Sequence, residues 1–128
     1  MRTLIDTNVI LSALMFPDST PAKALYHAAE FHEIILCDYI ISEIREKVAL
    51  KRPDLLKATE TLIQALPHER VSSDRPSGKT ISDPKDQPIL DTAIAGGVDI
   101  IISGDKHFKN LDIDKPKVLS PAEFLAAY

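Results

Sequence analysis

The strongest constraint in this sequence is the alternation of short, apolar, β-rich runs with longer segments of helical periodicity. Five runs have strand character, at residues 3–5, 34–37, 70–71, 100–103 and 118–119. Those long enough to judge are continuously apolar, which is typical of strands that are buried on both faces. Strands of this kind, separated by helices, favour parallel pairing with right-handed crossovers and helices on both faces of the sheet.

The segments between these runs carry start and stop signals for helices. Thr20 places a capping hydroxyl before a proline, and Ser120 opens a Ser-Pro-Ala-Glu capping box. The pair Gly96-Gly97 ends a segment whose apolar residues recur at helical spacing. We therefore expect one α/β domain over residues 1–128, built as a three-layer α/β/α sandwich around a parallel sheet of about four to five strands.

Composition narrows the class of protein. The chain has 128 residues, of which 45% are hydrophobic, and its 15 basic and 19 acidic residues give a formal charge of −4. A single cysteine, Cys37, excludes an intrachain disulfide, and no apolar run approaches the ~18 residues that a membrane span requires. An acid as early as Asp6 argues against a signal peptide. We expect a soluble cytoplasmic protein without a broad basic surface for nucleic acid.

Acidic residues stand where the predicted strands end and where the following helices begin. They are Asp6 after the first strand, Asp38 and Glu43 after the second, Asp83 and Asp86 before the helix that ends at Gly96, and Asp105 after the fourth strand. Because ligands bind at the carboxyl ends of parallel strands, we expect these carboxylates to gather at one site. Carboxylates held close together repel one another and need protons or a cation. Oxygen ligands without paired His or Cys suit Mg²⁺ or Mn²⁺, which serve phosphoryl chemistry.

Each acid also has a purely structural interpretation. The aspartates could cap or electrostatically stabilise the start of a following helix, and Glu43 could be the solvated partner of Lys47 at i+4. The other reactive residue types offer weaker candidates. No histidine has metal-ligand spacing, no serine lies in a nucleophile elbow, and Cys37 is typical of a small buried hydrophobe. The shared position of the acids at one sheet edge is what favours a functional site.

Four segments of the chain together form a recognisable set. They are Leu4-Ile5-Asp6-Thr7-Asn8-Val9, Ile41-Ser42-Glu43-Ile44, residues 83–93 (DPKDQPILDTA) and residues 101–108 (IISGDKHF). In this order and spacing they resemble the motifs of PIN-domain ribonucleases, and in particular those of the small VapC-like toxins of bacterial and archaeal toxin–antitoxin pairs. The resemblance extends from Arg2 to about Leu125.

The resemblance implies an α/β/α fold and RNA hydrolysis that depends on Mg²⁺ or Mn²⁺. It implies that four acids are both catalytic residues and metal ligands: Asp6, Glu43, Asp86 and Asp105. Asn8 and Ser103 match supporting polar positions, and Asp83 matches a less strictly placed one. The family often has a second acid close after the third, where this chain has Gln87 and Pro88, so the number of metal ions stays open.

An acidic chain can bind RNA if metal ions face the scissile phosphate and basic residues contact the flanking nucleotides. The candidate RNA-binding residues are Lys79, Lys85, Lys106, Lys109 and Arg45, with an ordinary solvated surface as the alternative. The resemblance also implies a homodimer and an antitoxin protein as partner. Alternative functions are a DNA nuclease or phosphatase with the same metal chemistry, a signalling receiver domain, and a catalytically silent scaffold that binds RNA or protein. Assigning four of the 19 acids to one site leaves 15 acids against 15 basic residues, so the rest of the chain would be neutral.

Overall fold

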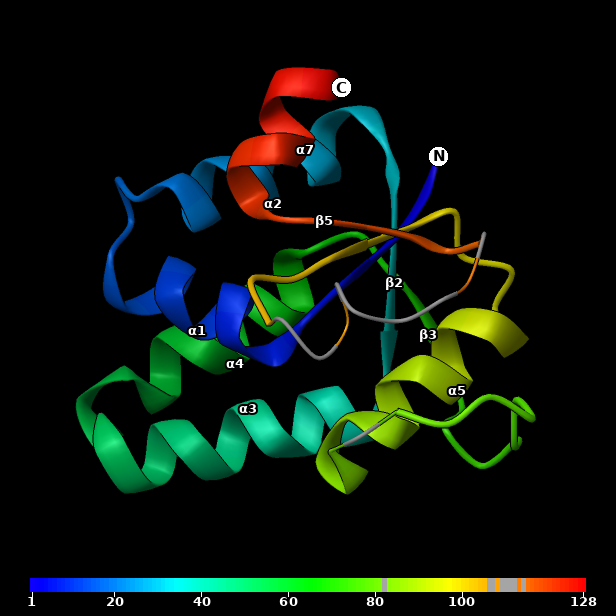
Figure 1. Ribbon diagram of the computed structural model, residues 1–128. Helices are drawn as coiled ribbons and strands as arrows, with labels where there is room; N and C mark the ends of the chain where they lie inside the picture. Colours follow the sequence, from blue (N-terminus) through cyan, green and yellow to red (C-terminus); the bar gives the residue numbers. More distant parts are fainter. Residues whose placement is uncertain (82, 106–107, 109–112, 114) are drawn as a thin grey trace.

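The computed structural model describes residues 1–81, 83–105, 108, 113 and 115–128, and it contains every strand that the sequence predicts (Figure 1). The strands are β1 (Arg2–Ile5), β2 (Glu33–Cys37), β3 (Glu69–Val71), β4 (Ile100–Ile102) and β5 (Lys117–Leu119). Their ends differ from the predicted ends by no more than one residue. Leu4, Ile35 and Ile101, on the three central strands, are completely buried, as continuous apolar runs require.

Helices occupy the segments between the strands. They are α1 (Thr7–Met15), α2 (Thr20–Phe31), α3 (Asp38–Lys51), α4 (Leu56–Ala65), α5 (Gln87–Ala95) and α7 (Pro121–Ala127), with 3₁₀ turns at Pro53–Leu55 and Pro84–Asp86. The capping box at Ser120 and the helix end at Gly96 are confirmed. The predicted cap at Thr20 is wrong by one position. Ser19 has the extended backbone of a cap and accepts a hydrogen bond from the Ala22 N–H, whereas Thr20 is already helical.

The sheet is entirely parallel, in the order β3-β2-β1-β4-β5. The chain leaves the central strand β1 toward β2 and β3, and then returns to β4 and β5 on the other side. The order therefore reverses between β1 and β4, where the carboxyl ends of adjacent strands diverge into opposite connections. Ligands of open α/β sheets bind at such a switch point.

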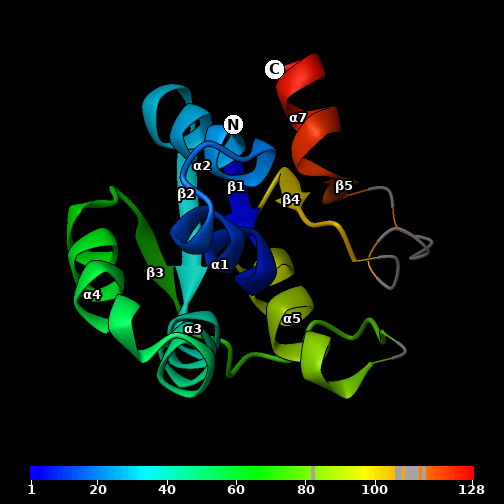
Figure 2. The ribbon, with the colours of Figure 1, turned by 90° about the vertical axis from the view of Figure 1, so that its left-hand side faces the viewer.

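Helices cover both faces of the sheet, which confirms the three-layer α/β/α architecture. The connections from β1 to β2 and from β2 to β3 run over one face of the sheet, so right-handed crossovers place α1 to α4 on that face. The connection from β3 to β4 runs in the opposite direction, which places α5 on the other face. Within the first layer α1 contacts α2 and α3, α3 contacts α4, and α7 packs on α2. Figure 2 shows the arrow of β2 pointing to α3, with α1 and α5 nearby, so these three helices border the carboxyl edge of the sheet. Among the described residues, no helix is both long and apolar enough to cross a membrane.

Candidate active site

A hydrogen-bonded pair joins the two strands at the switch point. Asp6 follows β1 and is 4% exposed, and Ser103 follows β4 and is completely buried. The Ser103 hydroxyl donates to Asp6 Oδ2 over 2.8 Å, and its Oγ accepts from the Asp105 backbone N–H over 3.0 Å. One serine thus orients the carboxylate after β1 and holds the backbone of the acid that follows β4.

The Asp6 carboxyl lies in an environment that disfavours its charge. Burial raises its pKa above the ordinary value, and the negative charges of Asp105 and Glu43 raise it further. The Ser103 hydroxyl and the Thr7 N–H act in the opposite direction without reversing the shift. The carboxylates of three separate segments therefore lie within electrostatic reach of one another. Asp6 occupies the N-cap position of α1 but makes no side-chain capping hydrogen bond, so helix capping does not account for this residue.

Glu43 reaches the same edge from the second turn of α3. Its Oε2 accepts a hydrogen bond from the Tyr39 hydroxyl over 3.3 Å and lies 3.9 Å from Lys47 Nζ. Burial and the negative charge of Glu43 raise the pKa of Tyr39 to about 12. The phenol therefore stays protonated at neutral pH and remains a hydrogen-bond donor to Glu43.

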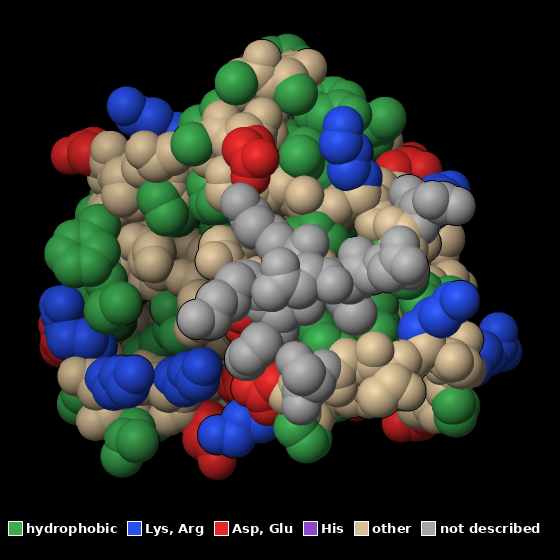
Figure 3. Space-filling model, in the orientation of Figure 1, with side chains coloured by type: hydrophobic (Ala, Val, Ile, Leu, Met, Phe, Trp, Pro, Cys, Tyr) green, Lys and Arg blue, Asp and Glu red, His purple; other side chains and the backbone are tan. Residues whose placement is uncertain are grey.

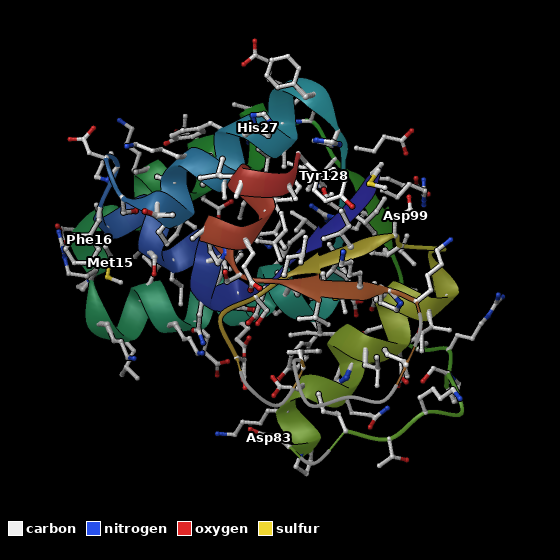
Figure 4. All side chains as sticks on the ribbon, turned by 45° about the horizontal axis from the view of Figure 1, so that its top comes forward. Met15, Phe16, His27, Asp83, Asp99 and Tyr128 are labelled. Atoms are coloured by element: carbon white, nitrogen blue, oxygen red, sulfur yellow. The ribbon has the colours of Figure 1, made fainter. Side chains whose placement is uncertain are left out.

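The acids before α5 complete the acidic edge. Asp86 is 9% exposed, and Asp83 lies at the start of the 3₁₀ turn that precedes α5 (Figure 4). Both carboxylates contribute to the raised pKa of Tyr39, which places them around the same phenol as Glu43. Asp83 also accepts a hydrogen bond from the Lys85 N–H, so the capping interpretation is correct for that residue.

Two further acids hold a loop instead of joining this edge. Asp38 accepts hydrogen bonds from the backbone N–H and the hydroxyl of Ser73, and the N–H bond is the main cause of its lowered pKa. Asp91, on α5, accepts from Ser77 and Gln87; burial opposes these bonds, but they lower the pKa of Asp91 below its ordinary value. Gln87, where the family often has an acid, therefore ties the segment after β3 to α5.

The predicted basic residues are distributed unevenly. Lys85 lines a cavity of about 330 Å³ with Glu43 and Tyr39, whereas Lys79 is exposed in the loop that follows β3. Arg45 forms a bidentate ion pair with Glu60 on α4. Lys106 and Lys109 lie outside the described residues. Of the three candidates that the structure describes, Lys85 is the one that lies beside Glu43.

Sequence reasoning missed two residues of this region, Tyr39 and Lys51, and it named Lys47 as the i+4 partner of Glu43, a pair that the structure contains. Tyr39 contacts Glu43, and Lys47 Nζ lies 3.4 Å from Asn8 Oδ1, which draws the predicted supporting residue Asn8 into the same network. Lys47 and Lys51 stand on the side of α3 that faces α1, and Figure 3 shows basic side chains in a row over α3 beside acidic ones. The i+4 spacing of Tyr39, Glu43, Lys47 and Lys51 is the signal that could have revealed one helix face directed at the site.

The donor chemistry of this edge fits a hard divalent cation. Its described acids supply only oxygen ligands, and burial with like charges already disfavours ionised Asp6. The Thr7 hydroxyl beside Asp6 is buried and hydrogen-bonds to no described residue, although buried hydroxyls ordinarily have a partner. Within the described residues, however, no three His, Cys, Asp or Glu side chains are positioned as a ready-made metal cage. The carboxylates would have to move closer together to bind an ion.

The sequence of this chain matches a known protein family. A sequence model of the PIN domain matches residues 2–107, and the chain belongs to this family. Family membership supports a nuclease, that is, a hydrolase acting on nucleic acid. No match was found among curated protein sequences.

Solved structures share the fold at low sequence identity. VapBC2 from Rickettsia felis, bound to a DNA fragment from its promoter, is 16% identical with a TM-score of 0.71, and DNA-bound VapBC from Salmonella typhimurium is 11% identical with a TM-score of 0.67. Each match covers 94% of this chain and 98% of the other. The RRP44 PIN domain of T. brucei is 15% identical with a TM-score of 0.56, over 97% of this chain and 78% of the other.

The raised pKa of Asp6 predicts that Asp6→Asn stabilises the metal-free protein. The folded state holds the Asp6 proton more tightly than the unfolded chain does, so the ionised carboxylate lowers the free energy of unfolding. This destabilisation is absent at pH values below the ordinary pKa of 3.8 and complete above the raised pKa of the folded state. In EDTA at pH 7 we expect the melting temperature to rise by about 2–5 °C, the size of a ~1 kcal/mol change. The difference should shrink as the pH falls toward 3.8. Calorimetry across this range measures it.

Asp99→Asn is the matched control. The Arg2 N–H and then Lys115 lower the pKa of Asp99, so its stabilising contribution is present above the unfolded pKa and is lost as the pH falls. This variant should therefore melt at a lower temperature than the wild type at pH 7. A large fall in the melting temperature of Asp6→Asn would contradict the account, because it would mean that the carboxylate stabilises the fold.

The contact between Tyr39 and Glu43 predicts a specific tyrosine titration. Ultraviolet absorbance should show one tyrosine that ionises near pH 12, and this transition should be absent from Tyr39→Phe. Glu43→Gln removes a neighbouring negative charge, so it should lower the Tyr39 pKa toward its ordinary value of 10. Glu60→Gln, which alters an acid paired with Arg45, is the control and should leave the transition in place. An unchanged transition in Glu43→Gln would show that this contact does not form.

Proposed function

We propose that this protein is an endoribonuclease that depends on Mg²⁺ or Mn²⁺ and leaves 3′-hydroxyl and 5′-phosphate ends. The observation that carries the proposal is the gathering of carboxylates at the sheet's switch point, where burial and like charges raise the pKa of Asp6. Such an arrangement is costly for a fold and is typical of a site that works with a cation. Family membership supports the nuclease class, and the resemblance of the motifs favours RNA as the substrate.

Asp6, Asp86 and Asp105 would hold the cation, with Glu43 as a further ligand or as the residue that orients the attacking water. When bound, the cation would supply positive charge next to the phosphate and would lower the pKa of the attacking water. Ser103 restrains the Asp6 carboxylate and the Asp105 backbone, so two of the ligands are oriented by one buried hydroxyl. Asn8 and Asp83 have supporting roles at the borders of the site.

The contacts of Glu43 suit a residue that orients water. Tyr39 and Lys47 both approach Oε2, whereas Oε1 forms no hydrogen bond with a described residue. Oε1 can therefore accept a hydrogen bond from the attacking water and direct its oxygen toward phosphorus. Attack forms the new P–O bond, the P–O3′ bond breaks, and the leaving 3′ oxygen takes a proton from solvent. Lys85, beside Glu43, would contact a phosphate of the bound strand.

This mechanism predicts metal-dependent cleavage of single-stranded RNA. End-labelled RNA should be cut in Mg²⁺ or Mn²⁺ and left intact in EDTA. Asp6→Asn and Asp86→Asn should each lower the rate by more than about 100-fold, because losing a ligand costs more than the roughly 10–100-fold of an outer-shell contact. Asp99→Asn is the control, because Asp99 lies at the amino end of β4, at the opposite end of the molecule from Asp83 (Figure 4).

Cleavage at equal rates by wild type and both site variants would contradict the catalytic assignment. RNA binding without cleavage in any metal would favour a silent scaffold. Faster cleavage of single-stranded DNA or of a phosphomonoester would favour the related nuclease or phosphatase function.

We further propose that the protein is the toxin of a toxin–antitoxin pair, with a small antitoxin protein as partner and a homodimer as the working form. The two VapBC structures support the proposal, since each shares the fold over nearly the whole chain. Light scattering of the purified protein measures its oligomeric state.

The toxin hypothesis predicts growth arrest on induced expression. A bacterial host should stop dividing when the wild type is expressed, because RNA cleavage without antitoxin halts translation. Asp86→Asn, expressed to the same level, should leave growth unchanged, and Asp99→Asn should arrest it. Growth curves with quantified expression measure this. Equal growth of the wild type and Asp86→Asn strains would argue for a nuclease without a toxin role.

A further inference from the structure

A small cavity opens beside the acidic edge, between α1 and α3. It measures about 190 Å³, and its apolar lining comes from Leu11, Met15 and Val48. Its polar lining includes Asn8, Lys47 and Lys51. Leu11 and Val48 are buried, whereas Lys51 is exposed and forms no ion pair with any residue that the structure describes. The cavity thus combines an apolar floor with a positively charged rim.

Lys47 connects this cavity to the proposed active site. Its Nζ lies 3.4 Å from Asn8 Oδ1 and 3.9 Å from Glu43 Oε2, and the residue also lines the cavity that contains Glu43 and Lys85. A strand whose scissile phosphate faces the carboxylates would therefore reach the cavity with an adjacent nucleotide. In Figure 3 the basic side chains over α3 continue outward from the acidic ones.

We propose that this cavity is a nucleotide subsite, which binds a base adjacent to the cleaved bond while Lys47 and Lys51 contact the flanking phosphates. The inference rests on the proposed ribonuclease function. It adds where a nucleotide of the substrate binds and that the substrate is single-stranded. A base bound between two helices must be unstacked, so the subsite selects single-stranded RNA over a duplex. It also assigns phosphate binding to Lys47 and Lys51 instead of Arg45, because Arg45 pairs with Glu60.

The size and charge of the cavity favour a nucleotide over other ligands. Pockets for drug-sized molecules begin at roughly 300 Å³, so a cavity of about 190 Å³ suits a single planar base better than a longer ligand. Every base has an apolar face for the floor, and the charged backbone on either side suits the cationic rim. Arg52 also lines the cavity but pairs with Asp54, so Lys51 is the lining cation that forms no ion pair with a described residue.

RNA binding measured in EDTA tests the subsite separately from catalysis. Fluorescence anisotropy with a labelled six-nucleotide single-stranded RNA gives Kd for the wild type, Met15→Ala and Lys51→Ala. Met15 lies at the end of α1 and is partly exposed (Figure 4), and Lys51 is exposed, so both variants should fold. We expect Met15→Ala to weaken binding about fivefold. Lys51→Ala should weaken it by a similar factor and reduce the salt slope by about one. Lys23→Ala, an exposed lysine on α2, is the matched control and should bind like the wild type.

A set of RNAs with one abasic position each identifies the base. One abasic position should weaken binding to the wild type about fivefold and have no further effect on Met15→Ala, because the lost contact is the same. Two results would overturn the subsite. One is that Met15→Ala and the abasic substitution weaken binding independently and additively at every position. The other is that Met15→Ala binds RNA with wild-type affinity, which is expected if the cavity takes a side chain of a partner protein. Failure of these tests together with metal-dependent cleavage would leave the proposed function intact. Cavity-dependent binding without cleavage would overturn the proposed function and retain the subsite.

Discussion

The hydrogen bond between Ser103 and Asp6 is the interaction around which this structure is organised. It spans the point where the strand order reverses, and it joins residues 97 positions apart in the chain. The same serine holds the backbone of Asp105, whereas Glu43 reaches the edge from α3 and Asp86 from the 3₁₀ turn before α5. Because Asp6 is buried with other negative charges nearby, the same interaction that orders the edge also holds a carboxylate where its charge is unfavourable. The fold tolerates this cost because the apolar residues next to the pair, Leu4 and Ile5 on β1 and Ile101 and Ile102 on β4, are completely buried.

Three aspartates near this edge have pKa shifts in opposite directions. Asp6 has a raised pKa and crowded negative neighbours, whereas Asp38 and Asp91 have lowered pKa values and accept hydrogen bonds from the segment after β3. Asp38 and Asp91 stabilise the fold as carboxylates and need no cation. All three acids follow strands or lie on helices beside the same edge. The direction of the pKa shift nevertheless distinguishes Asp6, whose surroundings favour a cation, from Asp38 and Asp91, which hold a loop.

The fold and the acids of the edge could be predicted from the sequence because both depend on local patterns. Continuous apolar runs marked the buried strands, and parallel topology then brought their ends together whatever the detailed packing. The basic residues could not be placed in the same way. Arg45 and Lys47 are two positions apart on α3, yet one pairs with Glu60 on α4 and the other approaches Asn8 on α1. That difference depends on which helix packs on each side of α3, and the sequence pattern of α3 does not specify it. Tyr39 was missed for a different reason, since an aromatic residue beside a buried stripe is most often core.

A crystal structure of the protein soaked with Mn²⁺ tests the central claim most directly, because manganese can be located by its anomalous scattering. The account predicts an anomalous peak bounded by the carboxylates of Asp6, Asp86 and Asp105, with Ser103 still bonded to Asp6 and the carboxylates drawn closer together than in the metal-free arrangement. No peak at this edge at millimolar Mn²⁺, with these three carboxylates no closer together than before, would contradict the claim that these acids form one metal site.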